Sequence, residues 1–175
     1  MQYEAMPSWR NITEPRPTFV THLECGLSGE EVPADRLHGL SSAGRPYLVR
    51  YDLPALARSL DKETLAQRPP DLWRYREFLP VRDNHNIVSL GECMTPLMPA
   101  PEVRGDLWIK DEGRLPTGSF KARGLCLAVS MAKELGVRRM AMPTNGNAGA
   151  AMAAYCRVAG IEAFVFCPDD TPQTN

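Results

Sequence analysis

The sequence has almost no excess charge and no long apolar run, and its first residues do not resemble a secretory signal; each of these features argues against a class of protein. Its 175 residues contain 20 Lys and Arg against 21 Asp and Glu, a formal net charge of −1, so no basic field indicates binding to nucleic acid or to an acidic membrane. No apolar run approaches the roughly 20 residues of a membrane-spanning helix. Met1–Ala5 lacks the charged segment and apolar core of a secretory signal. We therefore expect a cytoplasmic protein that binds neither nucleic acid nor a membrane.

The number and placement of the cysteines argue against a disulfide framework. The five cysteines are an odd number at uneven spacing. Cys126 and Cys156 fall in helical patterns and Cys167 ends a strand pattern, so we expect each of them to be a small buried side chain. Cys93 lies in a loop, where we expect no chemistry.

Two regions of the chain differ in texture, with a boundary near residue 86. Residues 1–85 are rich in Pro, Arg and acidic side chains, and the patterns there predict strands at 19–23 and 47–51 and helices at 54–60 and 72–79. Residues 86–175 alternate, with strands predicted at 106–110, 139–142 and 162–167 and helices at 119–135 and 147–159. Short connections between alternating elements predict an α/β domain with a parallel sheet and βα crossovers, preceded by an irregular segment.

Lys121 is the first candidate for chemistry. Ser119 is a suitable N-cap, which places Lys121 in the first turn of a helix, where the macrodipole disfavours a cation by about 0.3–1 kcal/mol. An ordinary surface lysine is one interpretation. However, the first turn of a helix favours an acidic residue, so a lysine there suggests that its amine has a function. The dipole, with partial desolvation by Leu115 and Phe120, favours the neutral amine that attacks a carbonyl. We interpret Lys121 as a candidate Schiff-base lysine.

The loop Thr144–Gly149 is the second candidate. It joins a predicted strand to the next helix, and ligands of open α/β sheets bind at the carboxyl ends of strands. Backbone N–H groups at a helix start can bind an anion such as a substrate carboxylate, and Asn147 can donate a hydrogen bond to a ring oxygen. The spacing of Gly146 and Gly149 does not match the dinucleotide fingerprint. An ordinary turn with an asparagine cap stays open as an alternative.

Several segments taken together point to one family. In chain order they are SLGECMTPL (89–97), WIKDE (108–112), PTGSFKARG (116–124) and TNGNAG (144–149), followed by FCPDDTP (166–172). Their order and spacing resemble the threonine synthase family of fold-type-II enzymes, which use pyridoxal 5′-phosphate, over residues 88–175. The lysine segment is typical of the whole superfamily, whereas Gly91-Glu92 with Thr95-Pro96-Leu97 leans toward threonine synthase.

The resemblance implies roles for particular residues. Lys121 would condense with the aldehyde of pyridoxal 5′-phosphate, Asn147 would hydrogen-bond the ring hydroxyl, and Phe120 with Ser119 would shape the seat of the lysine. The implied reaction converts O-phospho-L-homoserine and water to L-threonine and phosphate, with Lys121 moving protons while the cofactor is the electron sink. The partner expected at this site is thus a small amino-acid phosphate.

A second set of residues would surround the substrate carboxylate. By the resemblance this set consists of Thr144, Asn145, Gly146 and Ala148. Two positions depart from the family: Asn145 stands where Ser or Thr is common, and Cys93 stands where Gly is common. The first departure leaves the substrate preference open.

The length of the chain leaves further alternatives open. Family members are about twice this size, and the loop for the cofactor phosphate and the group facing the pyridine nitrogen would lie beyond Asn175, so we expect little or no activity from this chain alone. A related ammonia-lyase or dehydratase is one alternative. A truncated, non-catalytic α/β protein that acts by association is another, because an unfinished sheet exposes an edge and favours a homo-oligomer.

The N-terminal region resembles a small zinc-ribbon-like part that some relatives carry. Cys25-Gly26 and the segment 47–52 keep its outline, but Cys25 is the only thiol left. His22 and His38 do not restore the paired spacing of a structural zinc site. We therefore expect a degenerate ribbon without metal within residues 1–85.

Overall fold

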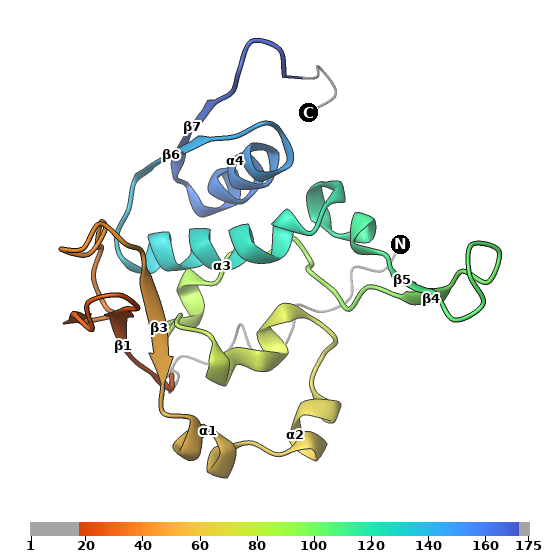
Figure 1. Ribbon diagram of the computed structural model, residues 1–175, viewed down its shortest axis with the longest axis horizontal. Coiled ribbons are helices and arrows are strands. Elements are labelled where there is room, and N and C mark those ends of the chain that lie inside the picture. The colour runs from red at the N-terminus through yellow and green to blue at the C-terminus, as the bar shows by residue number, and fades with distance from the viewer. Residues whose placement is uncertain (1–17, 172–175) are drawn as a thin grey trace. The chain divides into compact units, whose positions relative to one another are not determined.

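The computed structural model describes residues 18–171, and the expectations for Met1–Ala5 and Pro172 lie outside them. The chain divides into two compact units. The first consists of residues 1–69 and 73–86, and the second of residues 70–72 and 87–175. Figure 1 labels the elements within each.

The first unit is built on a small antiparallel sheet with the strand order β2-β1-β3. Its strands are β1 (Val20–Cys25), β2 (Glu31–Val32) and β3 (Tyr47–Tyr51). This confirms the strands predicted at 19–23 and 47–51. The antiparallel pairing of β1 with β3 places Leu23 opposite Val49 and ties the two ends of this segment together.

Two short helices follow the sheet, each begun by an aspartate. They are α1 (Leu53–Ser59), which confirms the helix predicted at 54–60, and α2 (Lys62–Gln67), which was not predicted. Asp52 accepts a hydrogen bond from Ala55 N (2.9 Å) and Asp61 accepts one from Thr64 N (2.6 Å), as N-cap residues do. The helix predicted at 72–79 is present as a 3-10 helix, Leu72–Phe78.

The single thiol of this unit, at the end of β1, is held by hydrogen bonds. Cys25 is buried, and its Sγ accepts from Ser41 Oγ (3.1 Å) and Ser28 N (3.5 Å). The hydrogen bonds from Ser28 and Ser41 lower the pKa of Cys25 to about 7. Among residues 18–171, no group of three or more His, Cys, Asp or Glu is placed to hold a metal ion.

The second unit begins with a hairpin that corrects the sequence prediction. The strand predicted at 106–110 exists as β5 (Trp108–Lys110), but it pairs antiparallel with β4 (Leu97–Pro99) and is not part of the parallel sheet. Ala100 N donates to Leu107 O (2.9 Å) and closes the connection. Because these strands are close in sequence, the loop between them costs less entropy to close than a long crossover.

The βαβ unit predicted near the C-terminus is confirmed. Strands β6 (Arg139–Pro143) and β7 (Glu162–Phe166) pair in parallel, and α4 (Asn147–Ala159) connects them. Gly160 ends α4 in the left-handed conformation at φ 70°, with its N–H bonded to Cys156 O, a common use of glycine. The parallel sheet has two strands within residues 18–171. The expected sheet with βα crossovers is therefore smaller than predicted, because the strand at 106–110 is not part of it.

The core of the second unit lies between two helices. Helix α3 (Lys121–Glu134) packs on α4, and α4 in turn packs on the β6–β7 pair (Figure 1). The apolar residues buried on the two helices are Ala122, Leu125, Cys126, Val129, Ala132, Ala151, Met152, Tyr155 and Cys156. In the part of the chain that the structure describes, no helix has the length and apolar character needed to cross a membrane.

A buried carboxylate joins the segment before β4 to this core. Glu92 is fully buried and accepts hydrogen bonds from Ser89 Oγ (2.7 Å), Leu90 N (2.8 Å) and Tyr155 Oη. Burial, followed by the hydrogen bond to Glu92, raises the pKa of Tyr155. Three donors on one buried carboxylate offset much of its desolvation, so this motif residue fixes the loop against α4.

Candidate functional site

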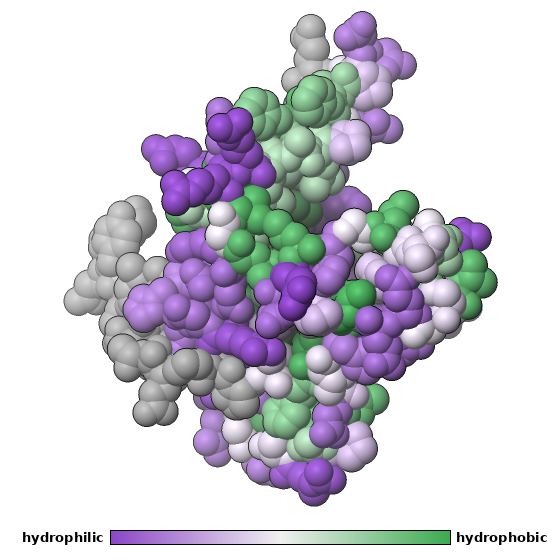
Figure 2. Space-filling view, turned by 90° about the vertical axis from the view of Figure 1, so that its left-hand side faces the viewer, coloured by the Kyte–Doolittle hydropathy of each residue, from purple (hydrophilic) through white to green (hydrophobic). Residues whose placement is uncertain are grey.

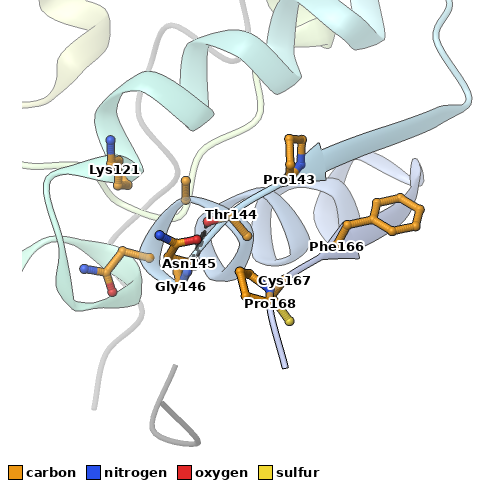
Figure 3. A pocket seen from close by; sticks show the side chains of 10 residues that line it. Lys121, Pro143, Thr144, Asn145, Gly146, Phe166, Cys167 and Pro168 are labelled. Atoms are coloured by element: carbon orange, nitrogen blue, oxygen red, sulfur yellow. Dashed lines mark hydrogen bonds between the residues drawn. The ribbon is translucent and has the colours of Figure 1, made fainter. Parts of the chain in front are cut away.

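An open pocket of about 790 Å³ lies where β6 and β7 end and α3 and α4 begin (Figure 3). Its volume is within the range of about 300–1,000 Å³ that ligand sites occupy. The residues that line it are Lys121, Pro143, Thr144, Asn145, Gly146, Asn147, Ala148, Phe166, Cys167 and Pro168. The structure therefore brings Lys121 together with the loop that the sequence analysis singled out.

Lys121 is the first residue of α3, and its amine rests on a neighbouring ring. The Nζ atom lies 4.7 Å from the centroid of the Phe120 ring, a cation–π contact worth about 0.5–1 kcal/mol at an exposed site. Phe120 is 58% exposed and does not line the pocket itself. The contact is weak enough for the amine to leave the ring when a ligand enters.

Ser119 does not cap α3, so that prediction was wrong. Phe120 stands at the N-cap position in a helical conformation (φ −59°, ψ −16°) and makes no side-chain cap. Ser119 O accepts from Ala122 N (3.2 Å) in a tight turn. The Ser119 hydroxyl is buried and has no hydrogen-bond partner among residues 18–171.

The turn before α4 is held by Thr144. Its Oγ1 accepts from Gly146 N (3.1 Å) and Gly149 N (3.3 Å), and Figure 3 shows the first of these bonds. Gly146 has φ 148° and ψ −102°, a conformation open essentially to glycine. Thr144 and Gly146 thus shape the loop that lines one side of the pocket.

This turn leaves two backbone donors at the pocket. Within residues 18–171, the N–H groups of Asn147 and Ala148 have no hydrogen-bond acceptor. They are among the unpaired donors of a helix N-terminus, where the macrodipole also favours negative charge. An anion such as a carboxylate can be bound there.

Four lining residues escaped the sequence analysis: Pro143, Phe166, Cys167 and Pro168. All of them stand at the carboxyl ends of the two parallel strands, and the rule that ligands bind there was the signal that could have found them. The expectation that Cys167 is buried was wrong, because it is exposed at the pocket. In Figure 3 the Phe166 ring points away from Lys121.

The other cysteines follow the prediction more closely. Cys126 and Cys156 are buried as expected, and Cys93 is exposed. Cys126 Sγ donates to Val88 O (3.2 Å), and burial raises the pKa of Cys156. Both thiols are therefore protected from reagents in solution.

Comparison with known proteins matches the second unit and extends into the first. The model of a family described as pyridoxal-phosphate dependent enzyme matches residues 88–175. A threonine synthase of Methanocaldococcus jannaschii is 35% identical over 150 residues, which cover 83% of this chain and 37% of that protein. A threonine synthase of Synechocystis sp. is 46% identical over 101 residues, covering 54% of this chain and 26% of that protein.

A third relative is covered to the same extent as the protein of Methanocaldococcus jannaschii. The threonine synthase of Methanosarcina acetivorans is 35% identical over 153 residues, covering 84% of this chain and 37% of that protein. The chain therefore spans about a third of the length of the curated relatives that it matches.

Proposed function

Because the chain belongs to the family of pyridoxal-phosphate dependent enzymes, we propose that it provides the cofactor lysine and the carboxylate loop of a threonine synthase. The overall reaction converts O-phospho-L-homoserine and water to L-threonine and phosphate: the C–O bond to phosphate breaks, and water adds its oxygen to the adjacent carbon. The observation that carries the proposal is the meeting of Lys121 with the unpaired amides of Asn147 and Ala148 in one pocket.

The residues present fit the cofactor. Among residues 18–171, no carboxylate pairs with Lys121, and its Nζ lies over the Phe120 ring, so its amine is available to an aldehyde. Lys121 would hold the cofactor, Asn147 would hydrogen-bond its ring hydroxyl, and Phe120 would shape the seat of the lysine. When bound, pyridoxal phosphate supplies the electron sink that makes the carbon next to the substrate amine acidic.

The loop would orient the substrate. The amides of Asn147 and Ala148, with the positive end of the α4 dipole, are placed to hold the substrate carboxylate, and Asn145 and Gly146 line the same wall. Thr144 would act by keeping the loop in shape, because its hydroxyl already accepts two amide hydrogens.

Proton movement would depend on the same lysine. When it is not attached to the cofactor, the Nζ atom of Lys121 would take protons from the substrate carbons and return them. A pocket that holds the substrate carboxylate on the loop and has Lys121 in its lining suits this repeated transfer at neighbouring carbons.

Because the chain spans only part of its relatives, we propose that turnover needs segments that they carry in addition. The test compares this chain with the polypeptide encoded by its whole gene, both supplied with pyridoxal phosphate and O-phospho-L-homoserine. We expect the whole polypeptide to release phosphate and threonine in equal amounts, and Lys121→Ala to abolish both. Release of ammonia and a 2-oxo acid from L-threonine or L-serine, without the synthase reaction, would identify a dehydratase instead.

We also propose that the chain forms a homo-oligomer. Apolar side chains gather in the upper part of Figure 2, where β6, β7 and the chain after them lie. Phe164 and Phe166 on β7 are 42% and 63% exposed, and a two-stranded parallel sheet rarely stands uncovered. Sedimentation should show a species larger than a monomer that Phe166→Ser shifts toward the monomer. A monomeric wild type across the concentration range would exclude self-association.

A further inference from the structure

The first turn of α3, which carries Lys121, lacks the supports that usually fix a helix start. No side chain caps it, and the Ser119 hydroxyl that could do so makes no hydrogen bond within the described chain. The segment before it holds Thr117 at φ 63° and Gly118 at φ 67°, and the left-handed region is unfavourable for a β-branched residue. Besides the backbone hydrogen bonds within the turn, a side-chain contact holds it in place.

That contact is the guanidinium of Arg123. Its Nε donates to Glu112 Oε2 (2.6 Å) and its Nη2 donates to Glu112 Oε1 (2.9 Å), which makes a bidentate pair. The same Nη2 also donates to Cys93 O (3.1 Å). Bidentate pairing of arginine with a carboxylate fixes direction as well as distance. Arg123 therefore fastens the helix start to two other segments of the second unit.

The carboxylate at the far end is itself anchored. Glu112 also accepts from Thr95 Oγ1, and Lys110 Nζ lies 3.7 Å from its Oε1. Lys110 Nζ donates to Thr95 O (2.8 Å) and Thr95 Oγ1 (2.6 Å). The group that holds Arg123 is thus a cluster, the residues Cys93, Thr95, Lys110 and Glu112, and not a single flexible side chain.

Helix geometry puts this anchor on the side of α3 opposite to the pocket. With 3.6 residues per turn, positions two apart are rotated by about 200°. Lys121 lines the pocket, whereas none of the residues that hold Arg123 does. A pull on Arg123 therefore rotates and tilts the first turn, and with it the direction in which the Lys121 amine projects.

We propose that Arg123 is a positioning residue: its clamp on Glu112 and Cys93 O sets the direction of the Lys121 amine at the pocket. The part that concerns cofactor attachment rests on the proposed function. Arg123 does not touch the pocket, so it acts through the backbone of the turn that it shares with Lys121. The clamp leaves the amine free of any carboxylate while holding the backbone that carries it.

The test uses Arg123→Lys, which keeps the charge but loses the bidentate fork, and Arg123→Met, which loses both. The matched control is Arg114→Lys, because Arg114 also pairs with a carboxylate, that of Asp111 (2.8 Å), but is 62% exposed. Circular dichroism establishes that each variant is folded at the working temperature.

The first readout needs no cofactor. The chain has only four lysines, at positions 62, 110, 121 and 133, so reductive methylation with ¹³C-formaldehyde gives few signals. The fifth lysine that Arg123→Lys or Arg114→Lys adds is identified as the signal that wild type and Arg123→Met lack. The Lys121 signal, assigned with Lys121→Arg, should be displaced by the ring current of Phe120 because its Nζ lies over that ring. We expect both Arg123 variants to move this signal toward the position of an exposed lysine. Arg114→Lys should leave the Lys121 signal where it is, and the Lys133 signal should not move in any variant.

The second readout is attachment of pyridoxal phosphate to Lys121, trapped with borohydride and located by peptide mass spectrometry. We expect Arg123→Lys to slow it about tenfold, since small misplacements of reacting groups cost rate steeply. A folded Arg123→Met with an unmoved Lys121 signal would overturn the proposal, as would attachment that falls only in proportion to unfolded protein. If wild type takes the cofactor at another lysine and not at Lys121, the proposed function fails, and the Lys121 signal still decides whether Arg123 positions the amine.

Discussion

Gly149 provides the sharpest prediction from the packing of α4. A Cβ added there would lie 2.5 Å from Thr144 Cγ2 and 2.8 Å from Val165 Cγ1. Both neighbours are β-branched and have few alternative rotamers, so overpacking costs about 1–3 kcal/mol. Moving Thr144 also weakens the hydrogen bond from Gly149 N, worth about 1 kcal/mol. Alanine regains about 1 kcal/mol of helix propensity, which leaves Gly149→Ala less stable by about 1–3 kcal/mol.

The assay is urea unfolding followed by circular dichroism, with Gly124→Ala as the matched control. A Cβ at Gly124 meets nothing within 4 Å, so that helix substitution should raise the free energy of unfolding by about 0.5–1 kcal/mol. Adding Thr144→Ser to Gly149→Ala removes the nearer methyl group and should recover part of the loss. The reasoning is refuted if Gly149→Ala is as stable as wild type, or if Thr144→Ser recovers nothing.

Three further predictions concern the same unit. Thr117→Gly should raise the melting temperature, because it relieves a left-handed β-branched residue that costs about 1–3 kcal/mol; an unchanged or lower value would contradict this strain. The hydrogen bond from Arg123 lowers the pKa of Glu112 to about 2 from 4.5, so its contribution is present above about pH 4.5 and is lost as the pH falls toward 2. The advantage of wild type over Glu112→Gln in urea unfolding should shrink across that window, and a constant difference would exclude the ion pair as its source. A thiol reagent should label Cys167 in the folded protein and Cys126 only after unfolding, and equal labelling rates would place both outside the core.

The sequence predicted local features well and non-local ones less well. The bounds of α4 follow from its apolar spacing and from Gly160, which are signals within a few residues of one another. Trp108–Lys110 could pair with a distant or a nearby strand, and no residue pattern shows that it pairs with the nearby Leu97–Pro99. Ser119 is a good N-cap by residue type, but a tertiary clamp from Arg123 holds that turn instead. Cys167 was predicted to be buried from its place at the end of a strand pattern. It lines the pocket instead, because strand pairing decides which strand ends lie there.

The same contrast holds for the candidate site. Lys121 and the loop Thr144–Gly149 were found from residue type and from their places at predicted helix starts. Their meeting in one pocket depends on the packing of α3 on α4, which the structure provides. Residue patterns do not specify the backbone turns at this site. They therefore do not predict that the Ser119 hydroxyl has no hydrogen-bond partner within the described chain, or that the Thr144 hydroxyl accepts from its own loop.

The most direct test of the account is to identify the lysine that binds the cofactor. The protein is equilibrated with pyridoxal phosphate, reduced with borohydride and digested, and the modified peptide is identified by mass spectrometry. With four lysines in the chain, the result is unambiguous. We predict the pyridoxyl group on Lys121 and its loss in Lys121→Ala. A label at position 62, 110 or 133 in its place, or equal cofactor binding by Lys121→Ala, would contradict the account.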